Sequence, residues 1–238
     1  LAYRTRSESL AGFAQLSWKP DILDRRLELT GGIRYTHDKR SLDQASVPAA
    51  GPIPSLDATP PVGPSRAASA SFSNWSYLAS LNMQWTPTLM TYARVATGYK
   101  SGGFDARAGV NPITGTSFDV TFRPEKATSF EIGFKSEFLD RRVRLNADWF
   151  YTKYKGLQVS QYSGGNGFVP NADAHYQGFE VELTALPLPH LQLDGSVGYT
   201  RATYDKFLLV DPATGIEADY RKTARFPYAP RFTAHAGA

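Results

Sequence analysis

The stretch EKATSFEIGFKSEF at residues 125–138 decides the fold, because apolar and charged side chains alternate along it. Phe130, Ile132 and Phe134 fall on one parity, whereas Glu131 falls on the other. Successive side chains of a β-strand point to opposite faces of its sheet. This period of two therefore predicts a strand with one apolar face and one polar face.

The same alternation recurs along the whole chain. It is sharp at residues 26–38, 72–85, 143–154 and 174–185, and weaker at 10–18, 90–100, 191–199 and 231–238. No segment carries an apolar stripe at helical spacing, so we predict an all-β protein with about nine antiparallel strands. Globular strands average about five or six residues, whereas a tilted strand needs about 9 to 11 to cross a bilayer. The longer segments favour membrane-crossing strands.

Composition narrows the class of protein. The chain has 238 residues, of which 42% are hydrophobic, 13% aromatic and 20% charged, and its mean hydropathy is −0.35. The sequence has no stretch near 18 apolar residues, which excludes transmembrane helices, but a membrane β-barrel keeps a low mean hydropathy. The net charge of +4 is spread along the chain, which makes nucleic acid an improbable partner. The absence of cysteine removes thiolate metal sites and cysteine nucleophiles.

The connections alternate between short and long. Short turns are expected at residues 20–25, 86–88, 139–141 and 186–189, and long loops rich in Gly, Pro, Asp and Ser at 41–71, 101–124, 160–171 and 205–229. Outer-membrane barrels have short periplasmic turns and long extracellular loops. We therefore expect an up-and-down barrel wall with its loops at one end and a first strand that runs inward. The repeated Leu-Asp-Arg-Arg at 23–26 and 139–142 should form two turns on the same side.

The parity of each strand assigns its side chains to a face. The apolar set should face lipid, with members Tyr77, Leu81, Phe130, Phe134, Leu145, Val181 and Leu183. The polar set should face the lumen, with members Arg34, Arg94, Lys100, Glu131, Lys135, Arg144, Asp148, Glu180 and Glu182. Aromatic girdles at the two interfaces are expected from Trp18, Trp75, Trp85 and Trp149 with Tyr35, Tyr77 and Tyr99.

Five short segments carry a family resemblance, and their order matters more than any one of them. They are GIRYTHD at 32–38, YARVATGYKSGGF at 92–104, PE at 124–125 followed by FEIGFK at 130–135, NA at 171–172 with GFEVE at 178–182, and APRF at 229–232. In this order and approximate spacing the chain resembles the C-terminal barrel of TonB-dependent outer-membrane receptors, especially the iron-complex and siderophore receptors.

The resemblance implies a partial receptor β-barrel domain over residues 1–238, in the outer membrane of a bacterium. Such receptors take up ferric siderophores or similar large, scarce solutes, and an energy-coupling TonB complex acts through a plug domain. Neither the plug nor its coupling box is recognisable in the sequence, and about nine strands are too few to close a 22-stranded barrel, so we expect an incomplete barrel. Outer-membrane lipid is a further expected partner, and no cofactor is expected.

Candidate ligand contacts are cationic and aromatic side chains near the mouth, and the set comprises Arg94, Lys100, Tyr154, Tyr176, Tyr220 and Arg221. A lumen-lining polar network is the competing interpretation of the charged members. The four histidines form no close pair, so no metal site is expected, and no spaced triad indicates catalysis. A barrel enzyme and a soluble antiparallel binding module remain as alternatives to the receptor.

Overall fold

The computed structural model describes residues 2–45, 65–105, 121–163, 166–210 and 216–238. Its main element is one antiparallel sheet of nine strands in the order β1-β2-β3-β4-β7-β8-β11-β12-β15. In this part of the chain no helix is long and apolar enough to cross a membrane. The strands are β1 (Ala2–Trp18), β2 (Leu27–Ala45), β3 (Ser65–Thr86), β4 (Leu89–Lys100), β7 (Glu125–Phe138), β8 (Val143–Gln158), β11 (Asn171–Leu188), β12 (Leu191–Lys206) and β15 (Phe232–Gly237).

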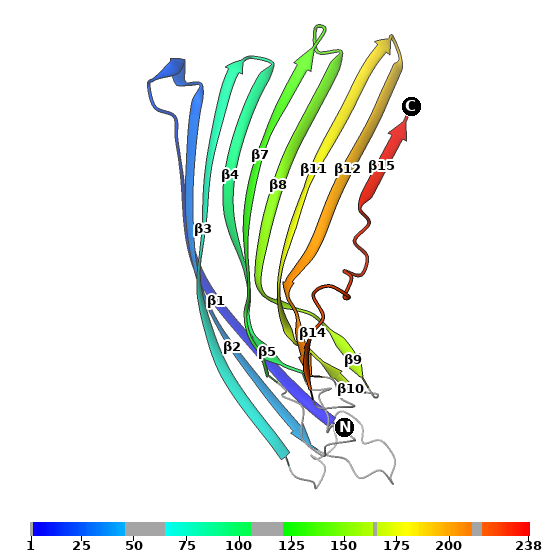
Figure 1. Cartoon of the computed structure of the whole chain (residues 1–238). Coiled ribbons are helices and arrows are strands. Elements are labelled where there is room, and N and C mark those ends of the chain that lie inside the picture. Colours follow the sequence, from blue (N-terminus) through cyan, green and yellow to red (C-terminus); the bar gives the residue numbers. More distant parts are fainter. Residues whose placement is uncertain (1, 46–64, 106–120, 164–165, 211–215) are drawn as a thin grey trace.

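Each long strand pairs with the strand that follows it, so the wall is up-and-down as the sequence predicts. The sheet curves along its length, with the short turns at one end and the longer connections at the other (Figure 1). β1 starts at the end with the long connections and runs toward the turn that precedes β2 (Figure 1). Within the described residues β1 and β15 are the two edges, so the sheet is open.

The connections at the loop end contain more regular structure than the sequence predicts. β2 and β3 continue to Ala45 and from Ser65, well into the expected loop at 41–71. Three short hairpins occupy parts of the other expected loops: β5 (Gly103–Phe104) with β6 (Thr121–Phe122), β9 (Gln161–Ser163) with β10 (Asn166–Phe168), and β13 (Leu208–Val210) with β14 (Glu217–Asp219). Residues 46–64, 106–120, 164–165 and 211–215 of these loops lie outside the described residues.

The strand register confirms the two faces. Ile132 pairs with Trp149, Trp149 with Phe179 and Phe179 with Tyr199, so the apolar parities of four strands share one face. On the other face Asp148 pairs with Glu180, and Arg94 with Glu131. We assign the apolar face to lipid, because large side chains such as Ile132, 55% exposed, would otherwise meet water.

The lipid-facing band has a defined outer limit on β7 and β8. Its last apolar pair is Phe130 with Tyr151, and the next outward positions carry Lys153 and then the pair Lys126 and Lys155. From the turn at Phe138 up to Phe130, the strand has a length that suits a bilayer crossing of about 9 to 11 residues. Side chains beyond Lys153 therefore lie outside the membrane-spanning segments.

The two Leu-Asp-Arg-Arg sequences form the same turn. Leu23, Asp24 and Arg25 have φ values of 51°, 54° and 59°, and the corresponding residues 139–141 have 50°, 56° and 63°. The last arginine of each repeat is tied to the neighbouring hairpin, since Arg26 donates to the Trp85 carbonyl at 3.1 Å and Arg142 to the Pro187 carbonyl at 2.7 Å. Left-handed non-glycine residues are costly, and these arginine contacts offset part of that cost.

A small core lies at the loop end of β8, β11 and β12. Ala172, Ala174, Tyr204 and Phe207 are buried there, and Phe207 is only 2% exposed. Gly178 lets β11 and β12 approach below it, because a Cβ at this position would lie 2.0 Å from the Tyr199 carbonyl oxygen. The outer end of the wall is therefore anchored by packing on one side of the sheet.

Candidate ligand-binding site

A polar pocket of about 450 Å³ lies at the loop end of β2 and β4. It is lined by Ser9, Arg34, Thr36, Asp38, Arg40, Ser76, Thr97, Tyr99, Lys100 and Ser101, and we call it the mouth pocket. Three cations face one carboxylate, Asp38, in this lining. The charge balance of the mouth pocket therefore favours an anionic ligand.

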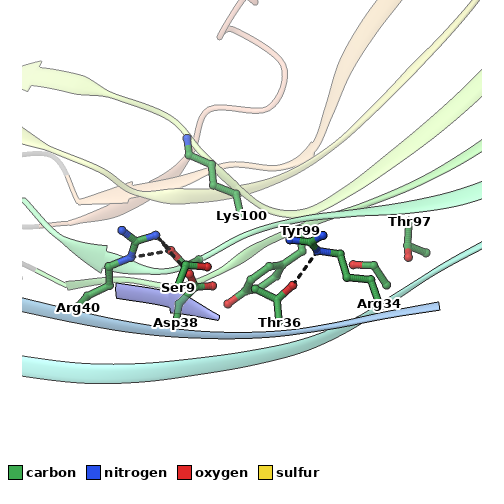
Figure 2. A pocket seen from close by; sticks show the side chains of 10 residues that line it. Ser9, Arg34, Thr36, Asp38, Arg40, Thr97, Tyr99 and Lys100 are labelled. Carbon is green, nitrogen blue, oxygen red and sulfur yellow. Dashed lines mark hydrogen bonds and ion pairs between the residues drawn. The ribbon is translucent and has the colours of Figure 1, made fainter. Parts of the chain in front are cut away.

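Local contacts fix the two arginines of the mouth pocket. Arg40 donates to the Ser101 hydroxyl from Nε at 3.0 Å and Nη2 at 2.7 Å, and its Nη2 lies 3.6 Å from Asp38 Oδ1. Arg34 donates from Nε to the Thr36 hydroxyl at 3.2 Å. Figure 2 shows the Tyr99 ring between these two arginines, while Lys100 extends from the other side. Each guanidinium keeps further N–H groups for a ligand, since it carries five donors.

The mouth pocket exists because β3 and β4 separate. Their ladder ends at the pair Leu78 and Ala96, although both strands continue toward the loop end. Thr97 then caps the free edge of β3, since its hydroxyl accepts from the Tyr77 amide at 2.8 Å and donates to the Tyr77 carbonyl at 3.3 Å. The side chains that follow Thr97 on β4 can therefore reach the space between the strands.

Tyr99 corrects one expectation from the sequence. Strand parity predicts it in the aromatic girdle, but it lines the mouth pocket instead. Its hydroxyl is buried beside the Asp38 carboxylate, and within the described part of the chain it makes no hydrogen bond of good geometry. The separation of β3 from β4 explains the difference, because parity predicts a face only where both neighbouring strands are paired.

Two of the six candidate contacts lie at or beside the mouth pocket. Lys100 lines it directly. Arg94 lies closer to the turns, in an adjoining hollow of about 320 Å³ that also contains Phe13 and Gln15. The two spaces share the polar side chains of Arg34, Ser76 and Thr97, and this shared polar surface links Lys100 to Arg94, although the hollow is also lined by apolar residues such as Ile33 and Leu78.

The three candidate tyrosines lie elsewhere and are largely packed against other rings. Tyr154 and Tyr176 meet edge to face at a centroid distance of 5.2 Å, and Tyr176 contacts Phe226 at 5.0 Å. Phe226 stacks on Tyr204 at 4.0 Å. Tyr220 is partly buried against the same cluster. We call these rings, together with Phe207, the aromatic cluster, and burial there raises the pKa of Tyr204.

Arg221 belongs to a local turn. Its Nε lies 3.2 Å from Asp219 Oδ2, and its backbone amide donates to Asp219 Oδ1 at 3.0 Å. The neighbouring Tyr220 carbonyl accepts from the amides of Thr223 and Ala224. The structure thus places Tyr154, Tyr176 and Tyr220 in the aromatic cluster and Lys100 and Arg94 at the polar surface. Arg221 belongs to neither group.

The sequence analysis missed most of the mouth pocket. Ser9, Thr36, Asp38, Arg40 and Ser101 were not candidates, although they line it. The sequence does contain a pattern that indicates part of this pocket. A row of polar side chains occupies consecutive lumen-facing positions of one strand, namely Arg34, Thr36, Asp38 and Arg40. The contribution of Ser101 depends on its contact with Arg40, across 61 residues of sequence.

Three of the four histidines make pairwise contacts, each on a different strand. His37 contacts Ser73 at 2.9 Å, His175 contacts Asp205 at 2.8 Å and His235 contacts Asp194 at 2.9 Å. Among the described residues, no group of three or more His, Asp or Glu side chains is arranged to hold a metal ion.

With an open antiparallel wall, a lipid-facing band and a polar mouth pocket in place, comparison with known proteins gives the family. The family model described as TonB dependent receptor-like, beta-barrel, matches residues 1–238. The chain belongs to this TonB-dependent receptor family. Its members are receptors and transporters, and they are outer-membrane β-barrel proteins of bacteria.

Individual receptors resemble the chain over most of its length. The pesticin receptor of Yersinia enterocolitica is 27% identical over 211 residues, which is 86% of this chain and 28% of that receptor. The catecholate siderophore receptor Fiu of Escherichia coli K12 is 28% identical over 189 residues, covering 75% of this chain and 24% of Fiu. The chain therefore spans only about a quarter of the length of these TonB-dependent receptors.

The crystal structure of the ferric yersiniabactin uptake receptor FyuA from Yersinia pestis has the same fold. Its TM-score is 0.70 at 24% identity, and the match covers 98% of this chain and 31% of FyuA. The nine strands therefore correspond to a section of a TonB-dependent receptor wall.

Proposed function

We propose that this chain is part of the β-barrel of a receptor that imports ferric siderophores or similar large, scarce solutes across the outer membrane. The observation that carries the proposal is the family match over residues 1–238, on a wall with an apolar outer face. Related receptors are named for pesticin, catecholate siderophores and ferric yersiniabactin. Two of these names, those of the catecholate siderophore receptor and the ferric yersiniabactin uptake receptor, support siderophore-bound iron as the imported solute.

The domain and its partners follow from the same proposal. Residues 1–238 form one partial barrel domain, and the wall surrounds a plug domain through which the TonB complex supplies energy. The chain contributes the passive wall and part of the mouth. The coupling step is assigned to the plug, so no residue of this chain carries it.

Within the chain, we assign the first ligand contacts to the mouth pocket and the adjoining Arg94. Catecholate iron complexes are anionic, and a guanidinium is a strong donor to anionic oxygen atoms. Lys100 is exposed and has no ion pair among the described residues, so its charge is available to such a ligand. Tyr154, Tyr176 and Tyr220 support this surface indirectly, by holding the neighbouring outer end of the wall together.

The proposal assigns no catalytic role to the chain. His37 contacts Ser73 on the outward face, and His175 contacts Asp205 on other strands, so the described histidines do not assemble a Ser-His-acid relay. The family consists of receptors and transporters, which supports the same assignment. A soluble binding module agrees less well with the exposed apolar band.

An uptake experiment tests the proposed function. The full-length receptor gene is expressed in a strain that lacks its own siderophore receptors, and ⁵⁵Fe accumulation is measured with ferric yersiniabactin, a ferric catecholate and ferric citrate. We expect energy-dependent accumulation with one iron complex, abolished in a strain without TonB. The proposal would be contradicted by iron accumulation that does not depend on TonB. It would also be contradicted if the receptor is present at normal levels and no iron complex accumulates.

A further inference from the structure

A group of cations lies on the outward face of the wall, next to the lipid-facing band. It consists of Lys126 on β7, Lys153 and Lys155 on β8, and Arg201 on β12, all exposed, and we call it the outer basic patch. These positions share the parity of Phe130, Trp149 and Tyr199 on the same strands. By register the patch therefore lies on the face opposite the lumen, and its β7 member, Lys126, pairs with Tyr99 at the edge of the mouth pocket.

The strand register places the patch directly beyond the apolar band. Phe130 pairs with Tyr151, and the next outward pairs are Thr128 with Lys153 and Lys126 with Lys155. Arg201 flanks the same limit, because Gln177 pairs with both Tyr151 and Arg201. On the loop side of the wall, this is the height at which lipid tails give way to headgroups.

Among the described residues, ion pairing neutralises only one cation of the patch. Lys155 is paired with Asp173 at 2.7 Å, and Asp205 is occupied by His175 at 2.8 Å. Lys126, Lys153 and Arg201 have no ion pair among the described residues. Lys126 and Lys155 lie directly opposite each other, and like charges in that arrangement destabilise a sheet. A counter-charge from outside the chain would remove this repulsion.

We propose that the outer basic patch binds the phosphate groups of lipid in the outer leaflet. The patch continues the lipid-facing surface, so the molecule that covers it is a lipid with its tails along Phe130 and Tyr151 and its headgroup at the cations. Lysine and arginine form charge-assisted hydrogen bonds to phosphate, and the guanidinium of Arg201 can bind two of its oxygens. This inference goes beyond solute uptake and does not depend on which solute is imported.

Lipid binding by the full-length receptor tests the proposal. The receptor is purified in non-ionic detergent and titrated with diphosphoryl lipid A, and binding is followed by native mass spectrometry. The variant K126Q/K153Q/R201Q removes the three unpaired charges and keeps the Lys155 ion pair. A basic side chain near an anionic lipid surface changes affinity by about fivefold, so we expect a loss of at least about tenfold.

The matched control K19Q/R25Q/K135Q removes three positive charges at the turns and on the lumen face. We expect this control to keep wild-type affinity, and wild type to bind monophosphoryl lipid A more weakly than the diphosphoryl form. Three results would overturn the proposal. They are unchanged affinity of the patch variant for lipid A, an equal loss of affinity in the control variant, and full displacement of lipid A by inorganic phosphate. If the triple variant does not fold, Lys153→Gln alone should lower affinity about fivefold, and unchanged affinity there would also overturn it.

Discussion

The mouth pocket and the aromatic cluster lie at the same end of the wall but are built in opposite ways. The mouth pocket is polar and open, and it forms where β3 and β4 lose their ladder beyond Leu78 and Ala96. The aromatic cluster is apolar and packed, around Tyr204 at 5% exposure, where β8, β11 and β12 remain paired. Paired strands bring rings into contact, whereas separated strands expose side chains that a ligand can reach.

An aromatic residue near the mouth of the wall is therefore not by itself a ligand contact. Tyr154 and Tyr176 attract attention in the sequence, yet their rings contact each other and Phe226. Nothing in the sequence singles out Arg40 as a ligand contact, yet two of its nitrogens donate to the Ser101 hydroxyl at the edge of the mouth pocket. Stability and recognition should therefore separate cleanly between the two regions under mutation.

The largest expected effect is on stability, in the aromatic cluster. Tyr204→Ala removes a buried ring that stacks on Phe207 and Phe226, so we expect the free energy of unfolding to fall by about 3 to 5 kcal/mol. Urea unfolding of the full-length receptor in lipid vesicles measures it. Lys100→Gln in the mouth pocket should change stability by less than about 0.5 kcal/mol. Equal losses of stability in the two variants would mean that the aromatic cluster and the mouth pocket do not differ in their contribution to stability.

The next effect is on recognition, in the mouth pocket. Arg34→Gln combined with Lys100→Gln removes two cations from the lining, and we expect affinity for the imported ferric complex to fall about tenfold, with unchanged stability. Equilibrium binding to cells that express the receptor measures this change. Tyr154→Phe with Tyr176→Phe is the control and should keep wild-type affinity. A larger loss in the tyrosine variant would move the site to the aromatic cluster.

A smaller effect is expected at Tyr99. Its hydroxyl is buried beside Asp38 without a hydrogen bond of good geometry in the described residues, so Tyr99→Phe removes a poorly satisfied polar group next to a carboxylate. We expect the free energy of unfolding to stay constant or rise by up to about 1 kcal/mol. The same urea experiment measures it, with Tyr77→Phe as the control on the outward face. A clear loss of stability would mean that the Tyr99 hydroxyl has a partner in the intact receptor.

The smallest expected change is a pH-dependent loss of local stability around Asp173, at the edge of the aromatic cluster. Burial would raise the pKa of Asp173, but hydrogen bonds from Lys155 Nζ at 2.7 Å and the Gly156 amide at 3.0 Å outweigh it and lower that pKa. The hydrogen bond with Asp173 raises the pKa of Lys155. A lowered carboxyl pKa stabilises the fold above its ordinary value of 3.8, and this is lost as pH falls through the lower folded value.

Hydrogen exchange at the Gly156 amide checks this pH dependence. We expect protection to be constant from neutral pH down to about pH 5 and to fall in stronger acid, as Asp173 becomes protonated. Asp173→Asn should show reduced protection at every pH and no acid transition. Protection that falls already between pH 7 and pH 5 would contradict the assignment of the transition to Asp173.

Alternation along single strands is enough to predict the class of fold and the two faces of the wall. Alternation at segments such as 125–138 predicts the strands, and the structure places Phe130 and Glu131 on opposite faces as expected. The identical Leu-Asp-Arg-Arg sequences also adopt identical left-handed turns. These features are local, because a period of two and a short turn depend on neighbouring residues only.

The position of the candidate site depends instead on contacts between distant parts of the chain. The mouth pocket joins Ser9 of β1, Arg40 of β2 and Lys100 of β4, which no spacing in the sequence connects. The direction of Tyr99 depends on the loss of the β3–β4 ladder, and the burial of Tyr176 depends on Phe226, 50 residues further along the chain. Strand separation and ring packing result from contacts between distant segments, and periodicity along one strand contains no information about them.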